Sequence, residues 1–241
     1  IYRCYRINGL YFAWIGVSMY TLTIKLLSPT LLMSGQGDVN TDSTIVHDRY
    51  GIPYIPAKRV RGVLYESALE VAEMMELSNL NTFTIKDVNI LFNRANEEDG
   101  EVAIYDNPRL SISNLVIPDY DTVARDIATL QNHKDCQQIF TKERILEEYT
   151  SMRYYTSIDQ STGAAMEGTL HNSRVLNKGC VFSGAIDVEQ ITDLERIILA
   201  CAARNLSGIG GKRNRGFGQV ECTIEHESFD LDVLGGTLWS K

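Results

Sequence analysis

The sequence lacks the cysteine patterns that build zinc sites and disulfide frameworks. Its 241 residues include five cysteines, which are scattered and form no CxxC pair. An odd number of dispersed cysteines is typical of reduced thiols in a cytosolic protein, where most serve as small core residues. A zinc cluster and a disulfide-stapled secreted domain are therefore disfavoured, and a cytoplasmic location is expected.

A membrane-length apolar run is also missing. The apolar stretch GLYFAWIGV at residues 9–17 is too short to span a bilayer. Arg3 and Arg6 precede it as in a signal peptide, but no A-x-A-like cleavage site follows. The chain begins without Met, and a clear strand pattern starts just after Met19. We expect residues 1–18 to be an upstream extension, the alternative being an extra strand, and we expect no membrane partner.

Positive charge is scarce: Lys and Arg number 23 against 31 Asp and Glu, which gives a formal net charge of −8. Net charge of this sign argues against indiscriminate binding of nucleic acid. Hydrophobic content of 44% and charged content of 22% are ordinary for a globular protein, so one large domain is expected. Binding of a polyanion therefore requires a local group of cations.

Such a group is present in the glycine loop, GIGGKRNRGFGQV, at residues 208–220. Glycine permits positive φ and close approach of backbone to a ligand, and successive N–H groups of such a loop form nests for anions. Lys and Arg add affinity for phosphate. The alternative is a mobile surface turn with ordinary solvating charges. The RNA-binding candidates in this loop are Gly210, Gly211, Lys212, Arg213, Arg215, Gly216 and Gly218.

Periodicity predicts an α+β fold. Polar and apolar residues alternate, as in strands, at residues 21–26, 180–188 and 220–224. Apolar spacing predicts a helix over 60–75, and Thr192 with Glu195 forms a capping box that opens a second helix. The order strand, helix, long middle, strand, helix, glycine loop, strand fits a ferredoxin-like (RRM-like) split βαβ core with large insertions.

The middle of the chain has no dominant period. Residues 78–150 mix short apolar pieces with polar runs, and we expect them to form an insertion rather than an independent domain. A polar, mixed segment follows at 154–176. The predicted organisation is a single domain over 19–241.

A second cationic element lies at the start of the first predicted helix, PAKRVRG, with Lys58, Arg59 and Arg61. A helix N-terminus favours anions through its free N–H groups and its dipole. The predicted architecture places this element beside the glycine loop, so together they predict a track for a polyanion.

Three stretches, in this order, resemble the RAMP superfamily of CRISPR proteins, in particular backbone subunits of type III effector complexes of the Csm/Cmr kind. Residues 41–62, TDSTIVHDRYGIPYIPAKRVRG, are similar to its D-S-x-[IV]-x-x-D-x-x-G-x-P motif. Residues 156–176 lie at the place of its thumb hairpin, and 208–220 is similar to its G-G-x-x-x-R-G-[YF]-G-x-V loop. The sequence departs from the pattern at residues 57–59, where Gly-Ser-Ser is frequent, and at His47, where Lys or Arg is common.

The resemblance implies partners: a CRISPR guide RNA gripped by its backbone, a target single-stranded RNA, and other effector subunits including copies or paralogues of the chain. It implies a thumb that interrupts guide–target pairing and flips out a nucleotide. Tyr154 and Tyr155 are candidates for stacking on bases, with hairpin packing as the alternative. The candidate thumb residues are Thr156, Met166, Leu170 and Arg174.

In catalytic members of the family, an aspartate of the first connection cleaves target RNA with a divalent metal, Mg²⁺ or another cation. The matching residue is Asp42. A carboxylate acts as a base or holds Mg²⁺, often with only one other carboxylate or none, and a flipped nucleotide reaches the in-line geometry that cleavage needs. The alternative for Asp42 is an Asx-turn. Candidates for catalytic support are His47, as a general acid or base, and Asp48; a hydrogen-bonded loop role is the alternative for both.

These residues leave several functions open. The first is metal-dependent cleavage of target RNA, and the second is a non-catalytic scaffold or end-capping subunit of the same kind of complex. A guide-processing nuclease is disfavoured because such enzymes usually pair two ferredoxin-like halves. An unrelated metal-dependent enzyme built on Asp38, Asp42 and Asp48 is the remaining alternative.

Overall fold

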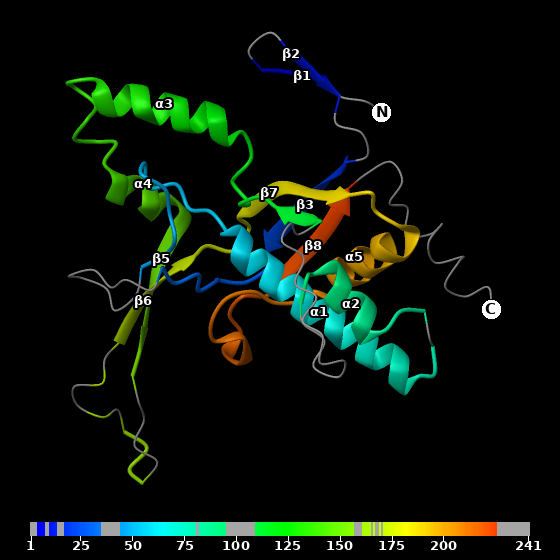
Figure 1. Cartoon of the computed structure of the whole chain (residues 1–241). Helices are drawn as coiled ribbons and strands as arrows, with labels where there is room; N and C mark the ends of the chain where they lie inside the picture. Colours follow the sequence, from blue (N-terminus) through cyan, green and yellow to red (C-terminus); the bar gives the residue numbers. More distant parts are fainter. Residues whose placement is uncertain are drawn as a thin grey trace.

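The structure, a computed structural model, has a central sheet covered by helices and a long hairpin that projects from the body (Figure 1). Near the N-terminus, β1 (Cys4–Ile7) and β2 (Leu10–Ala13) form a separate two-stranded antiparallel sheet. Side chains are described from Tyr20 onward. The described residues are 4–7, 10–13, 17–34, 44–80, 82–94, 109–156, 161–164, 166, 169 and 171–225.

The central sheet has four antiparallel strands in the order β4-β7-β3-β8. The predicted strands are confirmed, and the first of them starts earlier than alternation alone indicates, because Val17 pairs with Glu189. The α+β class is likewise confirmed. The strands are β3 (Val17–Leu26), β4 (Leu110–Ile112), β7 (Val181–Glu189) and β8 (Val220–Glu225).

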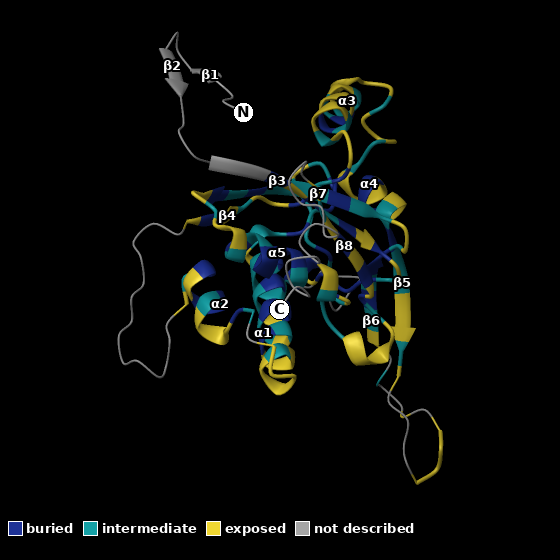
Figure 2. Ribbon diagram, turned by 90° about the vertical axis from the view of Figure 1, so that its right-hand side faces the viewer, coloured by how far each residue is buried: buried dark blue, intermediate teal, exposed yellow. Residues whose placement is uncertain are grey.

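Helices α1 (Ala57–Leu77), α2 (Ile85–Leu91) and α5 (Asp193–Asn205) lie on one side of this sheet (Figure 2). Alternate side chains of β3 point toward them, so that Leu22 and Ile24 are fully buried while Lys25 is exposed. Burial of these side chains removes apolar area from water, which is the main force that holds the layers together. Core residues contributed by the helices include Val60, Leu64, Ala68, Ile198, Leu199 and Ala202.

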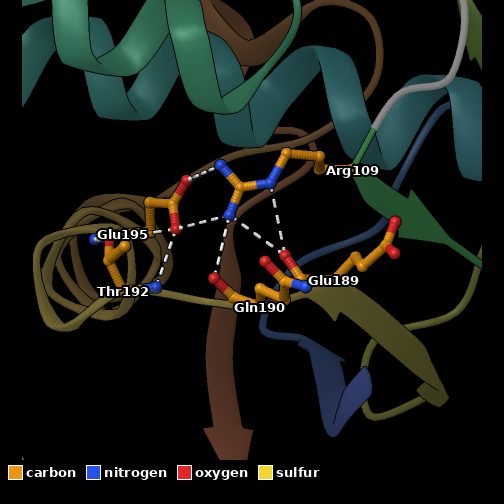
Figure 3. A network of polar contacts seen from close by, with 5 residues as sticks. All are labelled: Arg109, Glu189, Gln190, Thr192 and Glu195. Atoms are coloured by element: carbon orange, nitrogen blue, oxygen red, sulfur yellow. Dashed lines mark hydrogen bonds and ion pairs between the residues drawn. The ribbon is translucent and has the colours of Figure 1, made fainter. Parts of the chain in front are cut away.

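The start of α5 is held by a network of polar contacts (Figure 3). Both hydrogen bonds of the predicted capping box, between Thr192 and Glu195, are present. Arg109 donates to Glu195 Oε1 at 2.9 Å and to the carbonyl oxygens of Glu189 and Gln190 at 3.0 and 2.9 Å. The network explains how Glu195 is buried, because a buried carboxylate needs both a counter-charge and hydrogen bonds.

The segment 78–150 contains α2, β4, α3 (Tyr120–Asn132) and α4 (Lys142–Tyr149). Strand β4 pairs with β7 inside the central sheet, so this segment supplies a core strand as well as inserted helices. With only 3 residues, β4 is too short to show a period in the sequence. Along the chain the four strands of the sheet follow the order β3, β4, β7, β8, with α1 and α2 between the first two and α5 between the last two.

A long hairpin projects from the body of the molecule at the place expected for the thumb (Figure 1). It consists of β5 (Thr150–Tyr155) and β6 (His171–Leu176), which pair antiparallel. Its base is fastened to the segment after β3, because Thr30 and Leu176 exchange backbone hydrogen bonds of 3.0 and 2.9 Å. Among the described helices, none is both long and apolar enough to cross a membrane.

Candidate nucleic-acid interface

The glycine loop folds back on itself between α5 and β8. Gly208 bridges to Gln219, and the Ile209 N–H donates to the Gly218 carbonyl oxygen at 2.8 Å. Gly218 has φ +76°, and a Cβ there would lie 2.1 Å from the Ile209 carbonyl oxygen. Gly210 has φ +84°, with a Cβ position 2.3 Å from another carbonyl oxygen. Both positions thus require glycine, for backbone conformation and for space.

Backbone groups of the loop bond to the segment that follows β3. The Gly211 N–H donates to Leu31 at 3.0 Å, and the Gly218 N–H donates to Pro29 at 2.9 Å. The Gly216 N–H donates to Arg213 at 3.3 Å within the loop. These N–H groups are therefore engaged inside the protein. The glycines at these positions shape the loop, and affinity for an anion must come largely from its side chains.

The cations of the loop lie in, or directly before, a short 3₁₀ turn, η1 (Arg213–Arg215). Arg213 and Arg215 are exposed, and Arg213 Nη2 lies 3.7 Å from Glu66 Oε2 of α1. Both of these side chains are more than half exposed, so the pair is weak and a phosphate can compete for Arg213. Lys212, which precedes the turn, places its Nζ 3.3 Å from the centroid of the Tyr155 ring. The loop thus lies between α1 and the β5–β6 hairpin (Figure 1).

The cations at the start of α1 separate into different environments. Lys58 is exposed, whereas the Arg59 guanidinium donates to the Met33 carbonyl oxygen. Arg61 is half-buried and donates to the carbonyl oxygens of Phe92 and Leu110 at 2.7 and 3.0 Å. Burial, and then the neighbouring positive charge of Arg94, lower the pKa of Arg61. Arg61 thus joins α1 to the end of α2 and the start of β4.

The N-terminus of α1 also has an internal partner. No side chain of Pro56 caps the helix, but the Ala57 N–H donates to Asn114 Oδ1 at 2.9 Å. One of the free N–H groups expected at this end is therefore satisfied by the segment after β4. Of the three predicted cations here, Lys58 is the one that faces solvent.

The stem of the connection that carries Asp42 lies beside these elements. Met33 bridges to Ile45, and the Ser34 N–H donates to the Thr44 carbonyl oxygen at 2.9 Å. Met33 also accepts from Arg59, and its Cε lies 3.6 Å from the position of a Cβ on Gly211. The segment 31–33 is thus the point at which the Asp42 connection, the start of α1 and the glycine loop meet. Asp42 and Asp38 themselves lie outside the described residues.

Asp48 and His47 have the hydrogen bonds of loop residues. Asp48 Oδ1 accepts the N–H groups of Tyr50 and Ile52 at 2.8 and 2.9 Å, and its Oδ2 accepts the Tyr120 hydroxyl at 2.7 Å. This last bond, with burial, raises the pKa of Tyr120 to about 12. His47 Nδ1 donates to the Asp48 carbonyl oxygen at 2.8 Å. Asp48 thereby fastens the loop at 48–52 to α3.

The thumb candidates are spread along the hairpin. Arg174 donates to Thr150 Oγ1 at 3.1 Å, near the base. Farther out, the Thr156 and Thr169 hydroxyls lie 2.8 Å apart, and the latter donates to the Met166 carbonyl oxygen at 2.7 Å. The Met166 side chain is half exposed. Leu170 lies outside the described residues.

The tyrosines before the thumb tip face different surroundings. Tyr154 is 66% exposed, so hairpin packing does not account for most of its surface. Tyr155 is half-buried, with its hydroxyl 2.6 Å from Ser173 Oγ and its ring under Lys212. Sequence reasoning missed the Lys212–Tyr155 contact and the Glu66 partner of Arg213. Both join segments far apart in the chain, and no local spacing signals them.

The acidic and metal-binding side chains of the described residues are dispersed. Within this part of the chain, no three His, Cys, Asp or Glu side chains gather as a metal site. A site that includes Asp42 falls outside this part of the chain. The magnesium expectation for Asp42 therefore stays a prediction.

Comparison with known proteins places the chain in a family. In structure it is similar to a chain of the type III-B Cmr-beta complex bound to cognate target RNA, with TM-score 0.60, 12% identity, and coverage of 86% of this chain and 97% of that one. A chain of Cmr-beta in the apo state gives TM-score 0.56 and 12% identity, with 87% and 98% covered. No curated protein matches this chain. The family model of the RAMP superfamily matches residues 23–221, and the chain belongs to the RAMP superfamily.

Proposed function

We propose that this chain is an RNA-binding subunit of a type III CRISPR ribonucleoprotein and that it cleaves complementary target RNA with a divalent metal. The observation that carries the proposal is the meeting of the Asp42 connection, the start of α1 and the glycine loop at residues 31–33, beside the projecting hairpin. Membership of the RAMP superfamily and the fold shared with Cmr-beta chains support it. The proposed partners are a guide RNA, a target RNA and other subunits, including copies or paralogues of this chain.

Guide binding falls to the exposed cations around the glycine loop. Lys58, Arg213 and Arg215 are exposed, and phosphate contacts of this kind set affinity without reading sequence. The loop's N–H groups are engaged at several positions, so the glycines hold these cations in place. Because the chain as a whole has a formal net charge of −8, it binds RNA through this local surface, which neighbouring subunits extend in the assembly.

The hairpin lies next to this surface and suits contact with bases. Tyr154, 66% exposed, presents an aromatic face on which a base can stack, and Met166 is half exposed toward the tip. A hairpin that enters a guide–target duplex unpairs a nucleotide and frees its backbone to adopt in-line geometry. Positioning of this kind supplies a large part of the rate enhancement in RNA cleavage.

Asp42 is the proposed catalytic residue. The described residues that flank its connection, Ser34 and Thr44, are hydrogen-bonded to each other. They adjoin Met33, which contacts Arg59 and lies near Gly211, and so they lie next to the proposed RNA path. A lone carboxylate suits Mg²⁺, which keeps several waters and takes its other ligands from substrate phosphate. Bound there, the cation would stabilise charge on the cleaved phosphate. The carboxylate of Asp42 would hold it or accept the proton of the attacking 2′-hydroxyl.

The test is cleavage by the complex purified through a tagged copy of this chain. Asp42→Asn should lower the rate of metal-dependent cutting of end-labelled target RNA at least about 10²-fold and leave guide and target binding near wild type. His47→Ala, the matched control from the same loop region, should retain substantial cutting. Cleavage at the wild-type rate by the Asp42→Asn variant would show that another residue is catalytic. A wild-type complex that binds target and never cuts it would instead make this chain a scaffold or end-capping subunit.

A further inference from the structure

We infer that Lys212 and Tyr155 form a clasp that holds the β5–β6 hairpin in a set position beside the glycine loop, so that Lys212 is a positioning residue rather than a phosphate ligand. The Lys212 Nζ lies 3.3 Å from the centroid of the Tyr155 ring. A cation in this position is attracted by the negative face of the ring, and the attraction grows as the pair is shielded from water. Both residues are half-buried.

The backbone on the glycine-loop side of the clasp is held by hydrogen bonds on both sides of Lys212. Lys212 has φ 58°, in the left-handed region that a non-glycine residue adopts only where its surroundings enforce it. Its carbonyl oxygen accepts the Arg215 N–H at 2.9 Å, and the preceding residue, Gly211, is bonded to Leu31. The backbone therefore sets the direction in which the Lys212 side chain leaves the loop.

The hairpin side of the clasp lies at the outer end of the paired strands. Tyr155 and His171 are the last pair of the β5–β6 register, and the Tyr155 hydroxyl lies 2.6 Å from Ser173 Oγ. At the other end, Thr30 and Leu176 fasten the base of the hairpin to the body. A hairpin fastened only at its base can pivot, whereas fastening at both ends of the paired strands fixes its direction.

This inference rests on the proposed function in one respect: the hairpin and the cations of the loop act on the same RNA. If so, the clasp sets the distance between the phosphates held by the loop and the nucleotide displaced by the hairpin. Arg213 and Arg215 remain as phosphate ligands on the exposed side of the loop.

The first arm of the test needs no RNA and measures amide hydrogen exchange of the free full-length chain over residues 151–155 and 171–175. Lys212→Met and Tyr155→Leu should each speed exchange there by about two- to fivefold, the change that loss of a solvent-accessible cation–π contact supports. Because they remove the same contact, the double variant should be no faster than the faster single variant. Lys212→Arg should restore wild-type exchange, and Tyr154→Leu, the neighbouring tyrosine, should leave it unchanged. Wild-type exchange in Lys212→Met would overturn the clasp.

The second arm measures the salt dependence of RNA binding with a single-stranded RNA. Arg213→Met should reduce the slope of log affinity against log salt by about 0.7, the loss of one phosphate contact. Lys212→Met should keep the wild-type slope; a reduced slope would overturn its assignment as a positioning residue. If neither variant changes the slope while the exchange results hold, the clasp stands and phosphate contact by Arg213 is refuted.

Discussion

Neutralising the exposed cations around the glycine loop should weaken RNA binding by an amount that depends on salt. Lys58, Arg213 and Arg215 are exposed, and the partner of Arg213 among the described residues is Glu66, in a weak, solvent-accessible pair at 3.7 Å. Each phosphate contact adds about 0.7 to the slope of log affinity against log salt for a single strand, so three contacts add about 2. Between about 50 and 200 mM salt, the wild-type chain should therefore lose roughly 15-fold more affinity than the triple glutamine variant.

The assay is fluorescence anisotropy of a labelled single-stranded RNA titrated with the full-length chain over a series of salt concentrations. Arg61→Gln is the matched control, because its guanidinium is bonded to the carbonyl oxygens of Phe92 and Leu110. It should lower stability and leave the salt slope unchanged. Glu66→Gln should strengthen binding, since it removes a negative charge beside Arg213. A triple variant with the wild-type slope would show that these cations do not contact phosphate.

Three further outcomes test the fold around the interface. Gly218→Ala should lower the free energy of unfolding, measured with urea, by about 2–4 kcal/mol, because the new Cβ meets a carbonyl oxygen at 2.1 Å and φ is positive. Gly216→Ala, where φ is +79° and a Cβ has open space, should lower it by only about 1–2 kcal/mol. Glu195→Ala should lower the unfolding free energy by about 2–3 kcal/mol through loss of the cap and of the ion pair. The pKa of Tyr120 is raised from 10.0 to about 12 by Asp48, so its contribution to stability is full below pH 10.0 and is lost as pH rises through about 12. Asp48→Asn should flatten this alkaline loss in thermal melts recorded across that range, and an unchanged pH profile would contradict the assignment.

Periodic patterns made the core predictable. Strand β3 and helix α1 each repeat an apolar pattern over many residues. The start of α5 is predicted by its capping box. Strand β4 was not predicted, because its 3 residues are too few to show a period. Its place in the sheet depends on pairing with β7, which lies far away in the chain. Local pattern finds the elements whose own residues specify them, and it misses those specified by a distant partner.

The same division applies to the interface. The motifs identified the glycine loop and the start of α1. They did not show which of the cations there face solvent and which are bonded inside the protein. Arg61 donates to the carbonyl groups of Phe92, at the end of α2, and Leu110, at the start of β4, and neither partner can be recognised from PAKRVRG. Lys212 likewise faces a hairpin that begins more than fifty residues earlier in the chain, and only the fold brings its partner Tyr155 beneath it.

The glycines of the loop therefore carry a different meaning from the one that a phosphate nest suggests. A nest binds through free N–H groups, but the N–H groups of Gly211 and Gly218 are bonded to Leu31 and Pro29. Gly210 is required by its approach to Leu31. The glycine pattern thus specifies how the loop docks on the segment after β3, and that docking sets Gly211 against Met33 at the stem of the Asp42 connection. RNA binding by the loop and the proposed cleavage by Asp42 both depend on the segment after β3. A substitution that loosens the docking of the loop on this segment should therefore weaken both.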